Sequence, residues 1–315
     1  MSGSEAGRPG FVIVGAASRD IDVSDPRGWR MGGSVMYGAL LAARLGARVG
    51  ALIGVDTPSA TEGHELDLLR LAGADVRLVP LVRGPVFDNQ QTPRGREQVG
   101  HEGSDAIPPG ALPDEWRDCG AFLLGPVADE IPDAWASALP ADALLALAWQ
   151  GMLRRIEPGA RVVELPARPG PLLARSDYGS VSAEDLRAGG DPLERLLPRD
   201  GQELTITNDE HGAIHLRRDG DRLRMRRLPA VPVRRTMDTT GAGDAWHTTW
   251  FLGRIHGGPF GAAPLPTGRA LHLAAIVASL AVETYGLAGV PDRRMVAQRV
   301  AGLTASTDAP SGESI

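Results

Sequence analysis

Residues 238–244 read DTTGAGD and run directly into a helix-forming stretch at 245–255. A helix N-terminus carries unpaired N–H groups and a partial positive charge, and glycines let an anion approach the backbone closely. We therefore expect Gly241, Ala242 and Gly243 to form an anion hole for a phosphate group. Asp244 would lie beside that phosphate, where a carboxylate serves as the base that accepts a proton from an attacking hydroxyl. The stretch predicts phosphoryl transfer at the start of a helix.

Two simpler explanations compete with this one. Asp244 could merely favour the first turn of a helix, and the glycines could merely form a turn. A dinucleotide-binding fingerprint is disfavoured, because Trp246 stands where that motif needs its third glycine. His247, one turn further on, is more simply explained by helix packing than by catalysis.

Apolar bursts of strand length alternate with segments of helical period, which predicts an α/β fold. Ser34 is expected to cap a helix that Gly46 ends. Residues 76–87 alternate in hydrophobicity, which favours a half-exposed antiparallel strand. A second ribbon is expected at 214–228, with its turn at Asp219-Gly220. Strands are expected at 11–15, 48–53, 121–124, 143–148, 161–164 and 203–207, and long helices at 34–45, 242–255 and 268–284. One domain spans 10–303, between tails at 1–9 and 304–315 that are too polar to bury much surface and are expected to be disordered.

Composition limits the other function classes. The 315 residues carry a formal net charge of −6, which gives no reason to expect binding to nucleic acid or to an anionic membrane. All 33 basic residues are arginines, so a Schiff-base lysine and a Walker A lysine are excluded. The single Cys119 cannot form an internal disulfide. With neither a secretory signal nor a bilayer-spanning apolar run in the sequence, we expect a cytoplasmic protein.

The complete DTTGAGD string resembles the signature of the PfkB/ribokinase family of carbohydrate and nucleoside kinases. The stretch GGSVMYGALLAARLGARVGALIG, which begins at Gly32-Gly33, is similar to that family's N-terminal glycine pair and following helix. The two motifs are specific and occur in the family's order, and the resemblance covers roughly 11–303. It implies a ribokinase-like three-layer α/β/α sandwich, with a small β-sheet lid built from about 16–31 and 75–99.

The resemblance also implies roles for individual residues. Asp244 would be the catalytic base, with Gly241, Ala242 and Gly243 as the anion hole. Gly32 and Gly33 would lie against the acceptor, and an aspartate after the first strand would hold one of its hydroxyls, with Asp22 slightly preferred over Asp20. The lid side chains Phe87 and Asn89 are further candidates for acceptor contact, and simple lid packing explains them equally well. A homodimer formed through the lid is a candidate assembly.

The donor side departs from the family pattern. Thr207, Gly212, Asp238 and Thr240 are the expected contacts of ATP, yet Asp209 stands where the family usually has glycine. The family's Asn-Xaa-Xaa-Glu motif is replaced by Ser182-Ala183-Glu184-Asp185, so that Glu184 or Asp185 would supply the carboxylate for Mg²⁺. A monovalent cation is a further candidate cofactor. The Arg224–Arg227 and Arg234-Arg235 clusters are more simply explained as exposed ribbons than as phosphate contacts.

Several residues narrow the range of acceptor molecules that the site is expected to bind. Tyr37 occupies a region where many sugar kinases carry an asparagine, and Trp149-Gln150-Gly151 is similar to the inositol-kinase-like branch. Gln150 would reach hydroxyls of a sugar, an inositol or a related polyol. A bulky Tyr37 also suits a flat acceptor, so that a nucleoside kinase is the main alternative. A member that binds ligand without turnover is another hypothesis, which the intact Asp244 argues against and the altered Ser182 and Asp209 favour.

Overall fold

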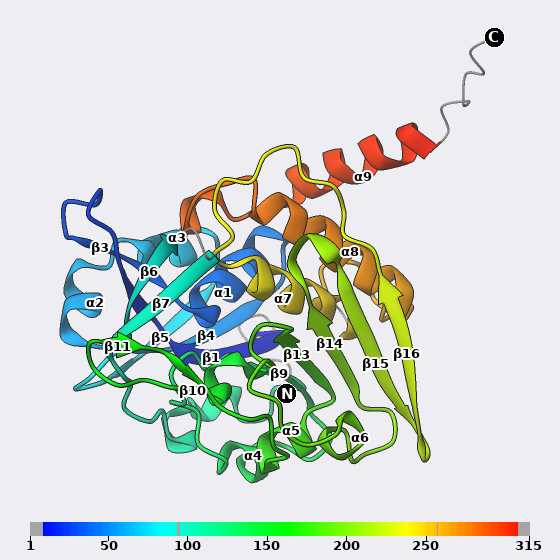
Figure 1. Ribbon diagram of the computed structural model, residues 1–315, viewed down its shortest axis with the longest axis horizontal. Coiled ribbons are helices and arrows are strands. Elements are labelled where there is room, and N and C mark those ends of the chain that lie inside the picture. The colour runs from blue at the N-terminus through cyan, green and yellow to red at the C-terminus, as the bar shows by residue number, and fades with distance from the viewer. Residues whose placement is uncertain (1–8, 93–94, 257, 308–315) are drawn as a thin grey trace, which may run out of the picture.

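The computed structural model describes residues 9–92, 95–256 and 258–307, and the chain forms three layers around a nine-stranded sheet. Helices cover both faces of this sheet, with α1, α7 and α8 above it and α4, α5 and α6 below it in Figure 1. The helices are α1 (Ser34–Arg44), α2 (Thr57–Glu62), α3 (Glu65–Leu71), α4 (Trp135–Ala138), α5 (Pro171–Arg175), α6 (Leu193–Leu196), α7 (Ala242–Arg254), α8 (Thr267–Ala281) and α9 (Arg293–Thr307).

The nine-stranded sheet has the order β16-β15-β14-β13-β9-β8-β1-β4-β5. All neighbours from β14 to β5 pair in parallel, while β15 and β16 add an antiparallel edge. Its strands are β1 (Phe11–Ala16), β4 (Val49–Val55), β5 (Asp75–Pro80), β8 (Ala121–Leu124), β9 (Leu144–Ala148), β13 (Tyr178–Ser182), β14 (Glu203–Thr207), β15 (Ala213–Asp219) and β16 (Arg222–Leu228). The expected α/β class is confirmed.

The central strand β1 explains why the sheet lies inside. Phe11 and Ile13 belong to one hydrophobic cluster, with residues of α1, α7 and α8, whereas Val12 and Val14 belong to a second cluster on the opposite face. Successive side chains of a strand point to opposite faces, so a strand that is apolar at every position needs cover on both. The helices of the two outer layers supply that cover.

A second sheet of five strands has the order β11-β7-β6-β2-β3. Because β2 begins directly after β1, this sheet starts at the carboxyl end of the central strand, and β2, β3, β6 and β7 lie to the left in Figure 1. Its strands are β2 (Ser18–Ile21), β3 (Trp29–Gly32), β6 (Val86–Thr92), β7 (Gly95–Glu102) and β11 (Ala160–Arg161). A further two-stranded sheet pairs β10 (Arg154–Arg155) with β12 (Val163–Glu164).

Several local expectations need correction. The antiparallel strand expected at 76–87 is wrong, because β5 pairs in parallel with β4 as the edge of the large sheet and the second sheet resumes only at β6. The strand expected at 161–164 is divided between β11 and β12, outside the large sheet. Ser34 does not cap α1, because Gly33 occupies the N-cap position. The sequence analysis did not identify β13 or α9.

Other local expectations are confirmed. Gly46 follows α1 with φ +89°, and the β15–β16 ribbon turns between Asp219 and Arg222.

At the C-terminus, α9 continues through Thr307, beyond the boundary expected at 304. The expected disorder of 1–8 and 308–315 lies outside the described residues.

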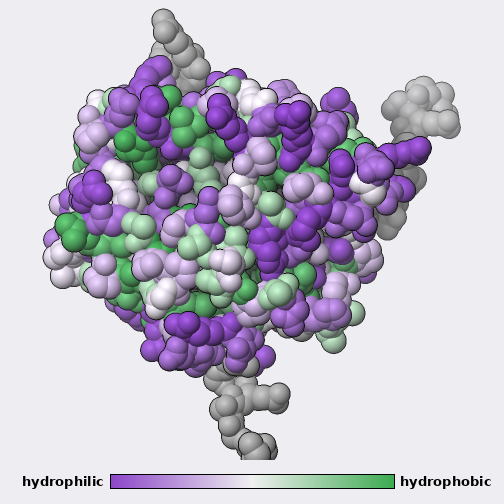
Figure 2. Space-filling model, turned by 90° about the horizontal axis from the view of Figure 1, so that it is seen from below, coloured by the Kyte–Doolittle hydropathy of each residue, from purple (hydrophilic) through white to green (hydrophobic). Residues whose placement is uncertain are grey.

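The surface mixes polar and apolar residues. On the face shown in Figure 2, hydrophilic residues are interspersed with small groups of hydrophobic ones. Within the described part of the chain, none of the helices has the length and apolar character needed to cross a membrane.

Candidate active site

The sheet order identifies where a ligand would bind. From β1 the chain moves to β4 and β5 on one side, then returns to β8, β9, β13 and β14 on the other. In open α/β sheets, ligands bind at the carboxyl ends of the strands where the order reverses, which here is between β1 and β8. The buried Glu130 braces this point, because its carboxylate accepts hydrogen bonds from the backbone N–H groups of Ala16, Val127 and Ala128 at 2.8–3.1 Å. No motif in the sequence distinguished Glu130.

The DTTGAGD stretch forms the start of α7 as expected. Gly241 is the N-cap residue with φ +81°, a left-handed conformation that glycine adopts without strain. No side chain within the described residues caps this helix, so its first turn keeps its character as an anion site. Asp238 shapes the preceding loop, accepting hydrogen bonds from the N–H groups of Thr240 at 2.9 Å and Gly286 at 3.3 Å.

Tyr37 is the side chain at which the two sequence motifs meet. Its ring packs against the α-carbon of Gly241, where an added Cβ would lie 2.3 Å from the ring. Burial raises the pKa of the Tyr37 hydroxyl, and the negative charges of Asp20, Asp238 and Asp244 raise it further. The half-buried Asp244, in the first turn of α7, and Asp20, on β2, therefore both act on the same side chain of α1. Asp20, which the sequence offers as a candidate to hold the acceptor, and Asp244, which it predicts to be the base, thus both influence the Tyr37 hydroxyl.

The glycine pair is required by the fold itself. A Cβ on Gly32 would lie 2.3 Å from a carboxylate oxygen of Asp20, and one on Gly33 would lie 2.6 Å from the carbonyl oxygen of Ala16. Gly33 also has φ +97°. The missing side chains thus let β3 and the start of α1 approach the carboxyl end of β1, with Asp20 held against Gly32 by a 3.0 Å hydrogen bond from the Ser18 hydroxyl.

Asp22 and Asp20 have different surroundings. The hydroxyl and N–H of Ser24 lower the pKa of the Asp22 carboxyl, together with Arg30 and Tyr285. Arg30 forms a 2.6 Å ion pair with Asp22, and the Tyr285 hydroxyl donates a 3.2 Å hydrogen bond to it. Asp22 therefore joins the β2–β3 hairpin to the loop after α8, whereas Asp20 lies against Gly32 and its negative charge helps to raise the pKa of Tyr37. Sequence reasoning missed Arg30 and Tyr285, because nothing local connects residues so far apart in the chain.

Phe87 and Asn89, the two candidate acceptor contacts on the second sheet, have different surroundings. Phe87 is only 3% exposed and packs in the hydrophobic cluster that contains Val12 and Val14. Asn89 accepts a 2.8 Å hydrogen bond from the Gln98 side chain on the neighbouring strand β7. Phe87 is thus a packing residue in this structure, whereas Asn89 belongs to a polar network.

Gln150 and Asp185 are close together, and Glu184 is not with them. The Gln150 amide donates to both carboxylate oxygens of Asp185 at 3.3 Å. The exposed Glu184 forms an ion pair with Arg187. Across residues 9–92, 95–256 and 258–307, no three His, Cys, Asp or Glu side chains gather in a way that could hold a metal ion. The described residues therefore do not form a metal site from protein groups alone.

The turn after β14, where a donor contact was expected, contains two residues with positive φ. Asp209 has φ +44° and Gly212 has φ +86°, and the N–H of Asn208 donates to the Gly212 carbonyl at 2.8 Å. Aspartate tolerates the left-handed region better than most residues, so it can replace the glycine of the family pattern. Thr207 ends β14 beside β13, where its carbonyl accepts a 2.7 Å hydrogen bond from Ala183.

The remaining side chains singled out in the sequence lie elsewhere. His247 is buried in α7, and burial lowers the pKa of its imidazole to about 3. Arg224, on the edge strand β16, forms an ion pair with Asp219. Neither residue joins the convergence at Tyr37.

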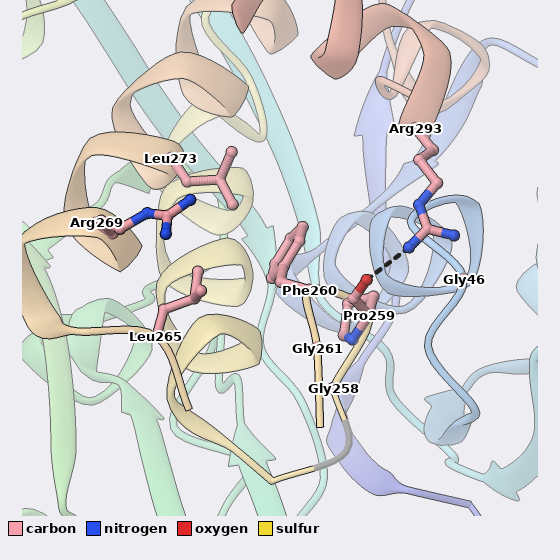
Figure 3. Close-up of a pocket in the computed structure, with 9 residues that line it drawn as sticks. All are labelled: Gly46, Gly258, Pro259, Phe260, Gly261, Leu265, Arg269, Leu273 and Arg293. Carbon is pink, nitrogen blue, oxygen red and sulfur yellow. Dashed lines mark hydrogen bonds between the residues drawn. The ribbon is translucent and has the colours of Figure 1, made fainter. Parts of the chain in front are cut away.

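A cavity of about 690 Å³ lies at the opposite end of α7 from Asp244 (Figure 3). Because α7 ends at Arg254, ten residues after Asp244, about 15 Å of helix separates Asp244 from the end that lies near the cavity. No carboxylate lines the cavity, and the guanidinium of Arg293 donates a 2.6 Å hydrogen bond to the Pro259 carbonyl within it. It therefore lacks the residues for the chemistry predicted at Asp244. Its lining residues are Gly46, Gly258, Pro259, Phe260, Gly261, Leu265, Arg269, Leu273 and Arg293.

No protein-family model matches the chain, and no curated protein matches it in sequence. Its structure is similar to a pyrophosphate-dependent kinase of the ribokinase family complexed with a pyrophosphate analogue and myo-inositol, with a TM-score of 0.68 and 19% identity over 91% of this chain and 99% of that chain. It is also similar to Arabidopsis thaliana ribokinase complexed with ribose and ATP, with a TM-score of 0.61 and 18% identity over 93% of this chain and 99% of that chain.

An archaeal nucleoside kinase of the ribokinase family, from Methanocaldococcus jannaschii, matches with a TM-score of 0.65 and 14% identity over 94% of this chain and 99% of that chain. Each match spans nearly the whole of both chains, while the identities are low. These likenesses show the architecture, and the three-layer arrangement with its second sheet agrees with them. The chain therefore has the fold of the ribokinase-family kinases.

Proposed function

We propose that this protein is a kinase that transfers a phosphoryl group to a hydroxyl of a small sugar, an inositol or a related polyol. The observation that carries the proposal is the convergence at Tyr37, where Asp244 in the uncapped first turn of α7 acts on the same ring as Asp20 of the second sheet. A base beside an anion site, opposite a second carboxylate that can hold a hydroxyl, is what phosphoryl transfer to an alcohol needs.

In the proposed reaction, Asp20 accepts a hydrogen bond from one acceptor hydroxyl and Asp244 accepts the proton of the attacking one. The attacking oxygen forms a bond to the terminal phosphorus of the donor as the bond to the bridging oxygen breaks. The N–H groups at the start of α7, around Gly241 and Gly243, stabilise the charge on the transferred group. The lid formed by the second sheet would exclude water during the transfer.

ATP is the proposed donor, with its terminal phosphate at Gly241–Gly243 and its remainder toward Thr207 and Gly212. Magnesium would enter as the counter-ion of the donor phosphates, because the described residues offer no protein-only metal site. Pyrophosphate is the second donor to test, since one solved structure of this fold is a pyrophosphate-dependent kinase and Asp209 stands at the nucleotide-side turn.

A polyol acceptor is favoured over a nucleoside by the position of Tyr37. Its side chain is 7% exposed and one edge of its ring packs on Gly241. The ring therefore offers little free surface on which a flat base could stack. Nucleoside phosphorylation and ligand binding without turnover remain outcomes of the test.

The test measures phosphorylation of myo-inositol, ribose, other sugars and adenosine, with magnesium and either ATP or pyrophosphate, and identifies the product by ³¹P NMR. Asp244→Asn should lower kcat by about 10²-fold or more, while the Kd for the donor changes little, because the base acts on the reacting hydroxyl. Asp67→Asn, an exposed aspartate on α3, is the control. Turnover within threefold of wild type in Asp244→Asn would refute the assigned base.

A further inference from the structure

Asp185 is a buried carboxylate surrounded by hydrogen-bond donors. Its side chain is 3% exposed and lies 3.2 Å from a guanidinium nitrogen of Arg154. The hydroxyl of Ser182 and the amide of Gln150 also donate to it. A buried carboxylate needs a positive charge nearby, and the ion pair with Arg154 supplies it.

Arg154 also reaches the second sheet. Its other terminal nitrogen donates a 3.0 Å hydrogen bond to Oε1 of Gln98, on β7. Gln98 in turn donates through Nε2 to Oδ1 of Asn89, on β6, at 2.8 Å. One guanidinium thus connects the carboxyl end of β13 to two strands of the proposed lid.

The charges determine which way the amides face. A carboxylate can only accept hydrogen bonds and a guanidinium can only donate them. Asp185 therefore requires the NH₂ group of Gln150, and Arg154 requires the carbonyl oxygen of Gln98. The Nε2 of Gln98 is then directed at the carbonyl oxygen of Asn89. These amide directions follow from chemistry that leaves no alternative assignment.

Gln150 follows directly on β9, at the carboxyl end of a parallel strand where ligands of this fold bind. Its NH₂ group is held by Asp185, and Oε1 makes no hydrogen bond within the described residues. Oε1 is also not enclosed by protein. The group that Gln150 presents to a ligand is therefore an acceptor, which suits a hydroxyl donor and disfavours a carboxylate or a phosphate.

We infer that Arg154 is a positioning residue for the acceptor. This role rests on the proposed kinase function and adds Arg154 to the residues assigned there. Through Asp185 it holds Gln150 with its carbonyl oxygen available to a neutral polyol hydroxyl, and through Gln98 it sets the direction of Asn89. In this role Arg154 acts through its contacts with Asp185 and Gln98. It makes the site selective for uncharged, hydroxyl-rich acceptors.

The test compares Arg154→Met, Arg154→Lys and Gln98→Leu with Arg155→Met as the matched control, since Arg155 is exposed and forms an ion pair with Glu157 on the surface. The probe is myo-inositol, or the acceptor that wild type turns over best. Arg154→Met should raise the KM for the acceptor about tenfold or more and the KM for ATP less than threefold. Arg154→Lys should restore part of the loss, and Gln98→Leu should raise the acceptor KM by a smaller factor.

A second readout does not depend on turnover. In ¹⁵N–¹H spectra of the free protein, the side-chain NH₂ signals of Gln150 and Gln98 should shift in Arg154→Met and stay in place in Arg155→Met. If wild type phosphorylates no acceptor, the kinase proposal fails and these signals alone decide the role of Arg154. Because losing one partner of a buried ion pair can prevent folding, Gln98→Leu decides it when Arg154→Met is unfolded.

Two results would overturn the inference. One is a folded Arg154→Met, or Gln98→Leu in its place, with an acceptor KM within twofold of wild type. The other is an equal rise in the KM values of donor and acceptor, which would indicate general loosening of the structure.

Discussion

Gly241 combines two requirements in a single residue at the start of α7. Its φ of +81° is strained for any residue with a side chain, and its α-carbon lies against the ring of Tyr37. Gly243, two residues later, is exposed, and a Cβ there would meet nothing within 4 Å. Two glycines of one motif therefore have different surroundings: the fold requires the first, while the second is open to solvent, where the proposed function places an anion.

Gly241→Ala should lower the free energy of unfolding by about 2 kcal/mol or more. The alanine would be strained in the left-handed conformation, and its Cβ would also overlap the ring of Tyr37. Gly243→Ala, the matched control, should leave stability unchanged or raise it, since alanine is favoured over glycine inside a helix. Urea unfolding of the two variants beside wild type measures both effects. Equal stability of the two variants would contradict the role given to Gly241.

At the scale of elements, α7 performs two tasks. Its first turn is open to an anion, while the following turns are buried between α1, α8 and the sheet. His247 lies on that buried part, and neither ring nitrogen has a hydrogen-bond partner among the described residues. Burial holds the pKa of His247 at about 3, so the imidazole is neutral in the folded protein near neutral pH.

The low pKa of His247 has a consequence for stability. An unfolded histidine binds a proton below about pH 6.5, whereas the folded one does so only near pH 3. As the pH falls through this window the unfolded state is favoured, and His247 should make the protein about 2 kcal/mol less stable at pH 5 than at pH 7. Urea unfolding at both pH values should show a smaller difference in His247→Phe than in wild type. An identical difference in the two proteins would contradict the buried, neutral state.

At the scale of the whole molecule, several contacts attach the second sheet to the core, and two of them lie around the proposed site. One is the Arg154 network, and the other is the contact of Asp22 and Arg30 with Tyr285. The guanidinium of Arg30 lies 4.1 Å from the centre of the Tyr285 ring, beside Gly286, whose N–H binds Asp238. The β2–β3 hairpin is thereby tied to the loop that supports the anion site.

Arg30→Met should loosen this hairpin. Losing a partly exposed ion pair and a cation–π contact should lower the free energy of local opening by about 1 kcal/mol, which corresponds to amide hydrogen exchange about fivefold faster in residues 18–32. Hydrogen-exchange mass spectrometry measures this, with Arg70→Met on α3 as a control that removes an exposed pair with Asp67. Unchanged exchange in residues 18–32 of Arg30→Met would exclude the contact as a restraint on the hairpin.

Local signals in the sequence predict much of this architecture. The DTTGAGD string predicted the glycine turn and helix at α7, and continuous apolar runs predicted β1, β8 and β9 near their observed bounds. These predictions succeed because capping, turn geometry and burial on both faces depend on neighbouring residues. The same reasoning failed at β5, because an edge strand of a parallel sheet has one exposed face and so shows the alternation typical of antiparallel strands.

The tertiary structure decided which polar residues act together. From the sequence, Asp22 and Asp20 were nearly equivalent, yet Asp22 contacts Arg30 and Tyr285, whereas Asp20 accepts a hydrogen bond from Ser18 and acts electrostatically on Tyr37. Glu130 and Arg154 carried no local signal at all, because their partners are distant in the chain. The sequence by itself therefore determined the sheet-and-helix class and the glycine turn at the start of α7, which are properties of short segments. The convergence of carboxylates at Tyr37 and the amide network of Arg154 depend on strand order, which brings distant residues together.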